Sequence, residues 1–166
     1  MQQLVPQLTD NLDRTIALYE QILATERGKQ RAVVACDLDT LGAVLAREEE
    51  LVELARPLEA ERAMLRAQFA QADERLGPDS RLKHLLALLD GPERDLLAEK
   101  RRRLLTLAGQ IQEVNRVNFQ LLRCSLDLVR GILEEIFGSA PAPGTYDAAG
   151  RQDAPSQAPT RVDQVL

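Results

Sequence analysis

Residues 95–137 read DLLAEKRRRLLTLAGQIQEVNRVNFQLLRCSLDLVRGILEEIF, and this stretch decides the fold. It is rich in Leu, Arg, Glu and Gln, which are good helix formers, and it stops at Gly138. A heptad seam runs along it: Leu104, Leu107, Ile111, Val114, Asn118, Leu121, Ser125, Leu128 and Ile132. The pattern predicts one long helix with a continuous apolar seam.

A second stripe lies beside this seam. It consists of Leu105, Ala108, Gln112, Asn115, Phe119, Leu122, Leu126, Val129, Leu133 and Ile136. Beyond Arg116 five of seven helical positions are apolar or small, whereas a surface helix needs only about three of seven. Two interpretations stay open: the helix is buried at the centre of its own bundle, or one of its faces binds another protein.

Two more long helices are expected upstream. Apolar residues at three- and four-residue steps predict a helix over residues 3–26, with Gly28 as its C-terminal cap. A second helix is expected over residues 37–75, with Asp37 or Asp39 as the N-terminal cap. Pro57 predicts either a kink in this second helix or a break into two helices.

A short helix is expected between two turn signals. The signals are GPDS at 77–80 and DGPE at 90–93, and the short helix spans residues 80–90. Asp90 is a capping residue type and Pro92 suits a first helical turn, so the second signal also predicts a restart of the chain as the long helix.

The composition of the 166 residues agrees with an all-α protein, since Leu, Ala, Arg, Glu and Gln dominate. We expect an elongated antiparallel bundle of long helices over residues 1–137. Residues 138–166 are rich in Pro and Ala and cannot bury enough apolar area to offset the ordering entropy. They predict a flexible tail.

Candidate catalytic chemistry is sparse. His84 is the only histidine, and it lies in the Leu-rich short helix, where a structural or surface role is expected. Cys36, His84 and Cys124 are too few and too far apart for a zinc site, and no phosphate-binding glycine motif occurs. The expected protein is not an enzyme and uses no cofactor or metal, and its two cysteines are expected to be reduced.

The charge and the apolar runs restrict the partners. The net charge of −5 argues against nucleic-acid binding, and Lys100–Arg103, the one basic run, is interpreted as a solvated helix face. The N-terminus lacks the pattern of a signal peptide, and no apolar run reaches the ~20 residues of a membrane span. A cytoplasmic protein is expected.

Asn118 falls on the seam of the long helix. A buried asparagine in a seam can fix the register of neighbouring helices at the expense of stability. The alternative is a polar contact with a partner protein. That partner can be a second copy of the chain. In this alternative the chain self-associates through the seam and is a coiled-coil adaptor protein. A homodimer of the chain when it is free of other partners also stays open.

Several segments in their order resemble the FlgN family of flagellar type III export chaperones. They are LVEL at 51–54, LEAER at 58–62, VNRVNFQLL at 114–122, SLDLV at 125–129 and TYDAAGR at 145–151. The most specific part is the Asn-x-x-Asn helix followed downstream by Tyr-x-x-x-Gly-Arg. Prolines in the tail, from Pro141 to Pro159, depart from a long continuous C-terminal helix.

The resemblance implies a function. Members of this family bind the hook-associated proteins that join hook to filament, prevent their premature polymerisation and deliver them to the export apparatus at the membrane. Their C-terminal part binds the helical ends of the cargo, which corresponds here to residues 117–137. The implied cargo-binding residues are Asn118, Leu121, Leu122, Leu126, Val129, Ile132, Leu133, Ile136 and Phe137. Tyr146, Gly150 and Arg151 are implied as contacts of the tail with cargo or export machinery.

Overall fold

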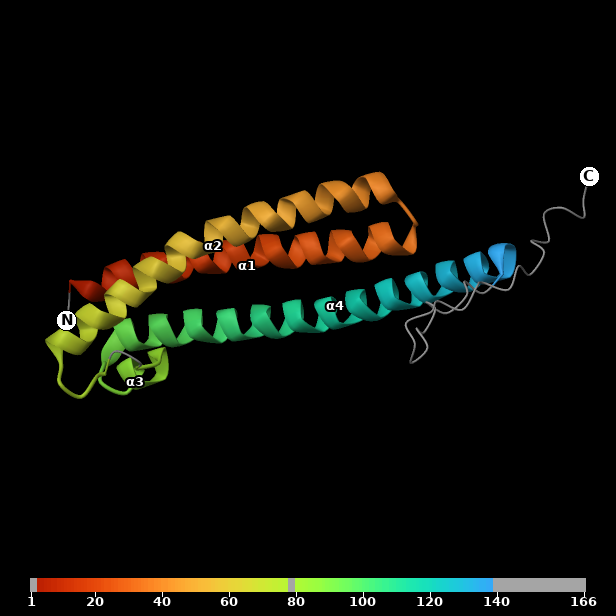
Figure 1. Ribbon diagram of the computed structural model, residues 1–166. Helices are drawn as coiled ribbons and strands as arrows, with labels where there is room; N and C mark the ends of the chain where they lie inside the picture. Colours follow the sequence, from red (N-terminus) through yellow and green to blue (C-terminus); the bar gives the residue numbers. More distant parts are fainter. Residues whose placement is uncertain (1–2, 78–79, 139–166) are drawn as a thin grey trace, which may run out of the picture. The chain divides into compact units, whose positions relative to one another are not determined.

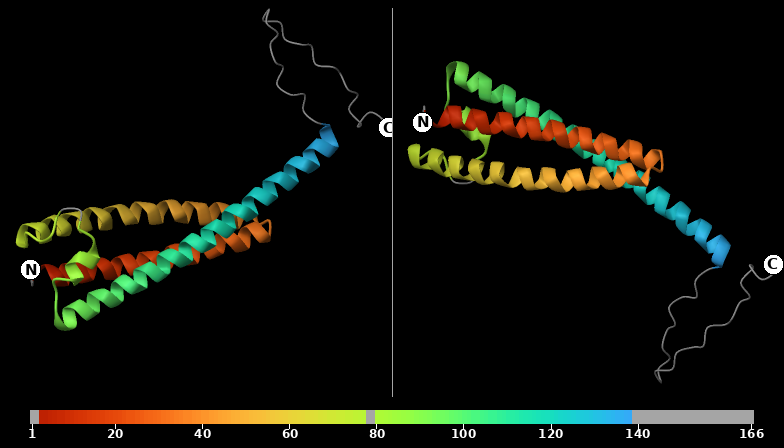
Figure 2. Two further views of the ribbon diagram at one scale, coloured as in Figure 1. Left: turned by 90° about the horizontal axis from the view of Figure 1, so that it is seen from below. Right: turned by 90° about the horizontal axis from the view of Figure 1, so that it is seen from above.

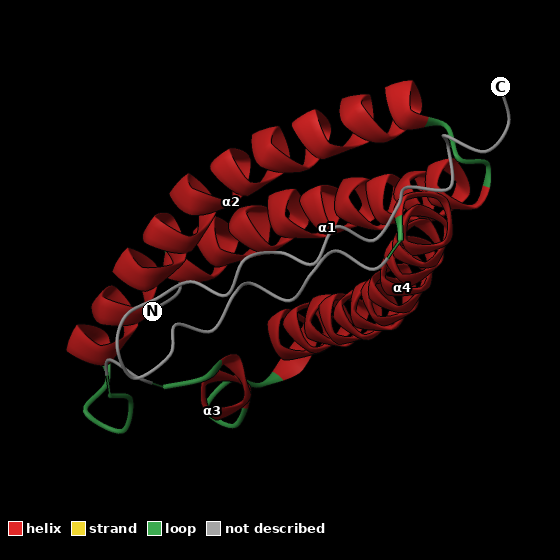
Figure 3. Cartoon of the chain, turned by 45° about the vertical axis from the view of Figure 1, so that its right-hand side comes forward, coloured by secondary structure: helices red, strands yellow, loops and turns green. Residues whose placement is uncertain are grey.

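The computed structural model describes residues 3–77 and 80–138. Within these residues the chain forms four α-helices and no strand (Figures 1 and 3): α1 (Leu4–Val34), α2 (Leu38–Ala72), α3 (Leu82–Leu86) and α4 (Gly91–Phe137). The predicted all-α class is confirmed. The chain divides into two compact units, Met1–Leu121 and Leu122–Leu166, and α4 contributes residues to both. The expected tail falls almost entirely outside the described residues.

Helix α1 is longer than the sequence pattern indicates. The predicted cap at Gly28 is wrong, because α1 continues past it and buries Ala32 and Val33. The helix ends at Val34 with Ala35 as its C-terminal cap, and the next residue, Cys36, has a φ of 53° in the left-handed region. The Cys36 N–H donates to the Val33 carbonyl at 3.1 Å and the Asp37 N–H to the Ala32 carbonyl at 3.0 Å, which is the Schellman pattern.

Helix α2 begins as predicted. The Asp37 side chain accepts a hydrogen bond from the Thr40 N–H at 3.0 Å, which confirms Asp37 as the N-terminal cap. The helix passes through Pro57 without ending, so the alternative of two separate helices is wrong. Pro57 is exposed, and water can therefore hydrate the Glu53 carbonyl that loses its helical hydrogen bond.

The short helix α3 covers only five residues of the predicted span 80–90, and Leu85 is its buried residue. Pro78 and Asp79, in the first turn signal, lie outside the described residues. Helix α4 begins at Gly91 with Pro92 in its first turn, as predicted. It ends at Phe137, and Gly138 follows with a φ of 75°, which glycine adopts without strain.

In the first unit α2 runs antiparallel to α1, and the first part of α4 runs parallel to α1 (Figures 1 and 2). Two hydrogen bonds between α1 and α2 agree with the antiparallel direction: Asn11 bonds Glu61, and Gln21, later in α1, bonds Arg47, earlier in α2. The apolar core gathers residues from all four helices and the loop after α2: Val5, Leu8, Leu12, Leu65, Phe69, Leu76, Leu85 and Leu97.

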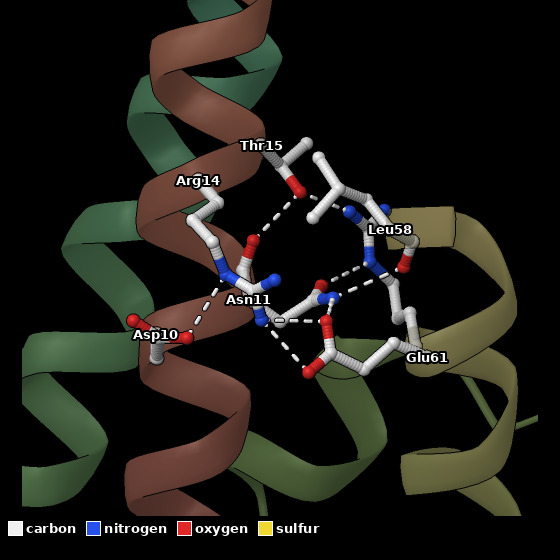
Figure 4. Close-up of polar contacts among 7 residues, drawn as sticks. Asp10, Asn11, Arg14, Thr15, Leu58 and Glu61 are labelled. Carbon is white, nitrogen blue, oxygen red and sulfur yellow. Dashed lines mark hydrogen bonds and ion pairs between the residues drawn. The ribbon is translucent and has the colours of Figure 1, made fainter. Parts of the chain in front are cut away.

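A buried polar cluster centred on Asn11 fixes the α1–α2 pair (Figure 4). The fully buried Asn11 amide donates to the Leu58 carbonyl at 3.0 Å and to Glu61 Oε2 at 2.8 Å, and its Oδ1 accepts from Arg62 Nε at 3.1 Å. The hydrogen bond from Asn11, followed by that from Arg14, holds the pKa of Glu61 below its ordinary value. The cluster therefore favours a single register of α1 against α2, because only that register pairs all of these polar groups.

Candidate functional site

Asn118 attaches α4 to α1 within the first unit. It is 1% exposed, and its Nδ2 donates to both the main-chain carbonyl and Oε2 of Glu26, each at 2.9 Å. The Glu26 carboxylate also pairs with Lys29 at 3.1 Å, and Lys29 reaches Glu48 on α2 at 2.5 Å. The contact supports the interpretation of Asn118 as a register residue. Its side chain is not part of an exposed surface.

The ionisable groups beside Asn118 feel both burial and one another. Burial raises the pKa of the Glu48 carboxyl, although the neighbouring Lys29 ammonium opposes that rise. Burial alone would lower the pKa of Lys29, but hydrogen bonds and charge from Glu48 and Glu26 raise it instead. Asn118, Glu26, Lys29 and Glu48 therefore form one partly buried charged cluster that joins α1, α2 and α4. Removing any one of them would leave a buried polar group of the cluster without its partner.

The basic run at Lys100–Arg103 also holds α4 against α1. Lys100 forms an ion pair with Asp13, and Arg103 pairs with Glu20 at 2.7 Å. The interpretation of the run as a solvated face is wrong for Lys100, whose side chain is only 14% exposed. Sequence reasoning missed this role because the acidic partners lie more than 80 residues away in the chain.

In the second unit the described part of α4 exposes most of its apolar side chains. Six of the seven residues implied as cargo-binding there are 47% to 69% exposed: Leu126, Val129, Ile132, Leu133, Ile136 and Phe137. Leu122 is half-buried, as is Leu121 in the first unit. The structure therefore gathers six of the implied residues on one open helical segment, which we call the α4 apolar face.

The α4 apolar face is wide. At about 100° per residue, its six members and Leu122 fall within an arc of about 140°, wider than the ~100° stripe of an ordinary surface helix. The polar side of the same segment carries Arg123, Asp127, Arg130 and Glu134. One side of this helical segment is therefore apolar and exposed to solvent, and the other side is charged. Large exposed apolar patches with a polar rim are typical of interaction sites.

Beyond Arg116, two large apolar residues of α4 are exposed although they were not among the implied site residues. Leu128 in the second unit and Phe119 in the first are each 66% exposed. Both lie on the stripes visible in the sequence, so the periodicity contained the signal that would have found them. Tyr146, Gly150 and Arg151 lie outside the described residues.

The residues considered for metal binding and catalysis lie apart from this surface or are single exposed side chains in the described part of the chain. Residues 3–77 and 80–138 contain no cluster of three or more His, Cys, Asp or Glu side chains suited to a metal ion. His84 is exposed, and its Nδ1 accepts a hydrogen bond from the Arg81 N–H at 3.3 Å. Cys36 and Cys124 are free and exposed. A search of the described helices finds none with the length and apolarity of a membrane span.

Comparison with known proteins gives one result. The family model described as "FlgN protein" matches residues 1–154, which includes both units' described helices and the α4 apolar face. Comparison with curated proteins gives no match, and comparison with solved structures gives none.

Proposed function

The chain belongs to the FlgN family of flagellar export chaperones, and from that premise we propose that its cargo is one or more hook-associated proteins. It binds their C-terminal helical segments, prevents premature polymerisation in the cytoplasm and delivers them to the export apparatus at the membrane. Residues 1–137 act as the chaperone domain, and the tail of residues 138–166 lies almost entirely outside the described residues. In the tail, Tyr146, Gly150 and Arg151 contact cargo or export machinery.

The observation that supports this proposal is the α4 apolar face. Residues 122–137 form a helical segment about 24 Å long at 1.5 Å per residue, with large apolar side chains open to solvent. An amphipathic helix from another protein can lay its own apolar stripe on such a face. Because cargo helices that drive polymerisation are themselves amphipathic, covering that stripe would keep the cargo monomeric.

The burial of Asn118 narrows the proposed site. The implied binding helix spans residues 117–137, but Val117 is half-buried and Asn118 is held by Glu26. We therefore place the cargo contacts after Leu121 and assign Asn118 to holding α4 on α1. The site then consists of Leu122 and the six residues of the α4 apolar face.

The test is calorimetric titration of the full-length chain with the C-terminal helical segment of a hook-associated protein. Leu126→Asp and Ile132→Asp each place a charge in the proposed contact and are expected to abolish binding. Leu54→Asp is the matched control, because Leu54 is an exposed leucine of α2 in the first unit. Unchanged affinity in both α4 variants, with circular dichroism showing intact helices, would refute the proposed surface.

The α4 apolar face also fits a second candidate function, in which a second copy covers it and the chain is a self-associating helical adaptor. Sedimentation of the full-length chain across a range of concentrations distinguishes the two. The chaperone proposal expects any homodimer of the free chain to dissociate when cargo is added. A dimer that Leu126→Asp abolishes and that excludes cargo at all concentrations would favour the adaptor.

A further inference from the structure

A second recognition site lies within the first unit. An open-sided cavity of about 360 Å³ is lined by residues of α1, α2, α3 and the first part of α4, together with the loop before α3. Its apolar wall includes Leu8, Leu12, Phe69, Leu85 and Leu104. We call this cavity the arginine groove, after the four arginines among its lining residues. Its volume is at the lower end of the range of ligand-binding clefts.

The charged residues of the groove all have one sign. Four arginines line it, Arg62, Arg66, Arg81 and Arg101, and no described Asp or Glu does. This is unexpected in a chain with a net charge of −5. An apolar cavity whose charged lining residues are all cations is complementary to a ligand that is apolar and anionic at once.

The four arginines of the groove form no ion pair with a described carboxylate, in contrast to several other arginines of the protein. Arg14, Arg103 and Arg116 each lie within 2.7 Å of a carboxylate oxygen. Arg62 instead donates to the neutral acceptors Asn11 Oδ1 and Thr15 Oγ1. Across residues 3–77 and 80–138, Arg66, Arg81 and Arg101 form no ion pair with a carboxylate. Their fork-shaped guanidinium groups remain available to bind one.

We propose that the arginine groove binds an acidic, amphipathic peptide segment of a partner protein. One or two large apolar side chains of the segment occupy the Leu- and Phe-lined floor, and flanking Asp or Glu carboxylates bind the arginines in bidentate geometry. The groove belongs wholly to the first unit, whereas the α4 apolar face belongs to the second. Binding at the groove is therefore a separate activity, which does not rest on the proposed cargo site.

The test uses a designed peptide of about 14 residues, roughly four helical turns, with leucines at three- and four-residue steps and glutamates elsewhere. One control peptide carries lysines in place of the glutamates, and another carries serines in place of the leucines. The protein is the full-length chain with Leu126→Asp and Ile132→Asp, so that the α4 apolar face does not contribute. Fluorescence anisotropy measures the affinity.

The Glu-Leu peptide is expected to bind, and both control peptides are expected to bind at least tenfold more weakly. Arg66→Gln with Arg101→Gln is expected to reduce the affinity by about tenfold or more, since each substitution removes a charge-assisted contact. Arg27→Gln with Arg94→Gln is the matched control and is expected to leave the affinity within about twofold, because both are exposed arginines outside the groove.

Several results would overturn the proposal. They are equal binding of the Lys-Leu peptide, unchanged affinity in the Arg66→Gln, Arg101→Gln chain, and the absence of binding by any peptide. Binding of decanoate without binding of the Glu-Leu peptide would also overturn it and assign the groove to a small anionic amphiphile. If the double variant is not helical by circular dichroism, the two single variants replace it, and each must weaken binding.

Discussion

Replacing Asn11 with alanine should destabilise the first unit more than any exposed ion pair does. The Asn11 side chain is fully buried and makes three hydrogen bonds to α2, of which two involve the charged groups of Glu61 and Arg62. A net contribution of about 1 kcal/mol for the neutral bond and about 1.5–3 kcal/mol for each charged one gives an upper sum near 4–7 kcal/mol. The actual loss is smaller, because Glu61 keeps Arg14 and Arg62 keeps Thr15. We expect about 2–4 kcal/mol.

Arg14→Ala is the control within the same cluster. The Arg14 side chain is 47% exposed, and its ion pairs with Asp10 and Glu61 are therefore screened by water. Exposed pairs contribute about 0–1 kcal/mol. Urea denaturation followed by circular dichroism gives both free energies of unfolding. If Arg14→Ala lowers that free energy as much as Asn11→Ala does, burial is not what gives this cluster its strength, and the reasoning fails.

Three further outcomes are expected. Leu126 is 69% exposed, so burying this exposed surface on cargo is worth about 1–2 kcal/mol, and Leu126→Ala should weaken cargo binding about 5- to 30-fold in calorimetry with little change in thermal stability. Asn118→Asp places a second carboxylate against Glu26 and should lower the free energy of unfolding by about 3–5 kcal/mol at neutral pH, measured by urea denaturation. Hydrogen bonds from Arg75 lower the pKa of Asp73 from 3.8 to about 2. The stability that the Asp73 carboxylate supplies should therefore be complete above its unfolded pKa of 3.8 and disappear as the pH falls through about 2, so that wild type and Asp73→Asn converge in urea denaturation over this range.

The sequence was sufficient to predict the helices because their stripes are long and regular. The α4 pattern predicted one helix ending at Phe137, and the Asp37 cap and the Pro92 restart were also readable from local chemistry. These features depend on residues within one or two turns of each other. The stripes of residues 122–137 show an apolar surplus, but the pattern alone left open whether these side chains are buried in the bundle or face a partner, and the structure exposes them.

Features that depend on distant partners could not be predicted. The end of α1 at Val34 departs from the expected cap at Gly28, because tertiary burial of Ala32 and Val33 extends the helix and the non-glycine residue Cys36 adopts the left-handed conformation after it. The ion pair of Lys100 with Asp13 and the bond of Asn118 to Glu26 join residues separated by 87 and 92 positions. Nothing in a single sequence indicates which carboxylate a given cation will meet.

The arginine groove illustrates the same limit. Its four arginines come from three separate parts of the sequence, and each reads locally as an ordinary solvated residue. Only the folded arrangement shows that they gather around one apolar cavity without carboxylates among its described lining residues. The Asn11 cluster was missed for a related reason, since a polar residue within an apolar stripe gives no indication of its partners on α2.

Hydrogen–deuterium exchange of the full-length chain, with and without the C-terminal helical segment of a hook-associated protein, tests the central claim most directly. In the free chain the amides of residues 122–137 should exchange quickly, because their side chains make few buried contacts. Bound cargo should slow exchange in these residues and leave most of α2 unchanged. Slowed exchange confined to α1 and α2, with residues 122–137 unaffected, would contradict the claim that the α4 apolar face binds cargo.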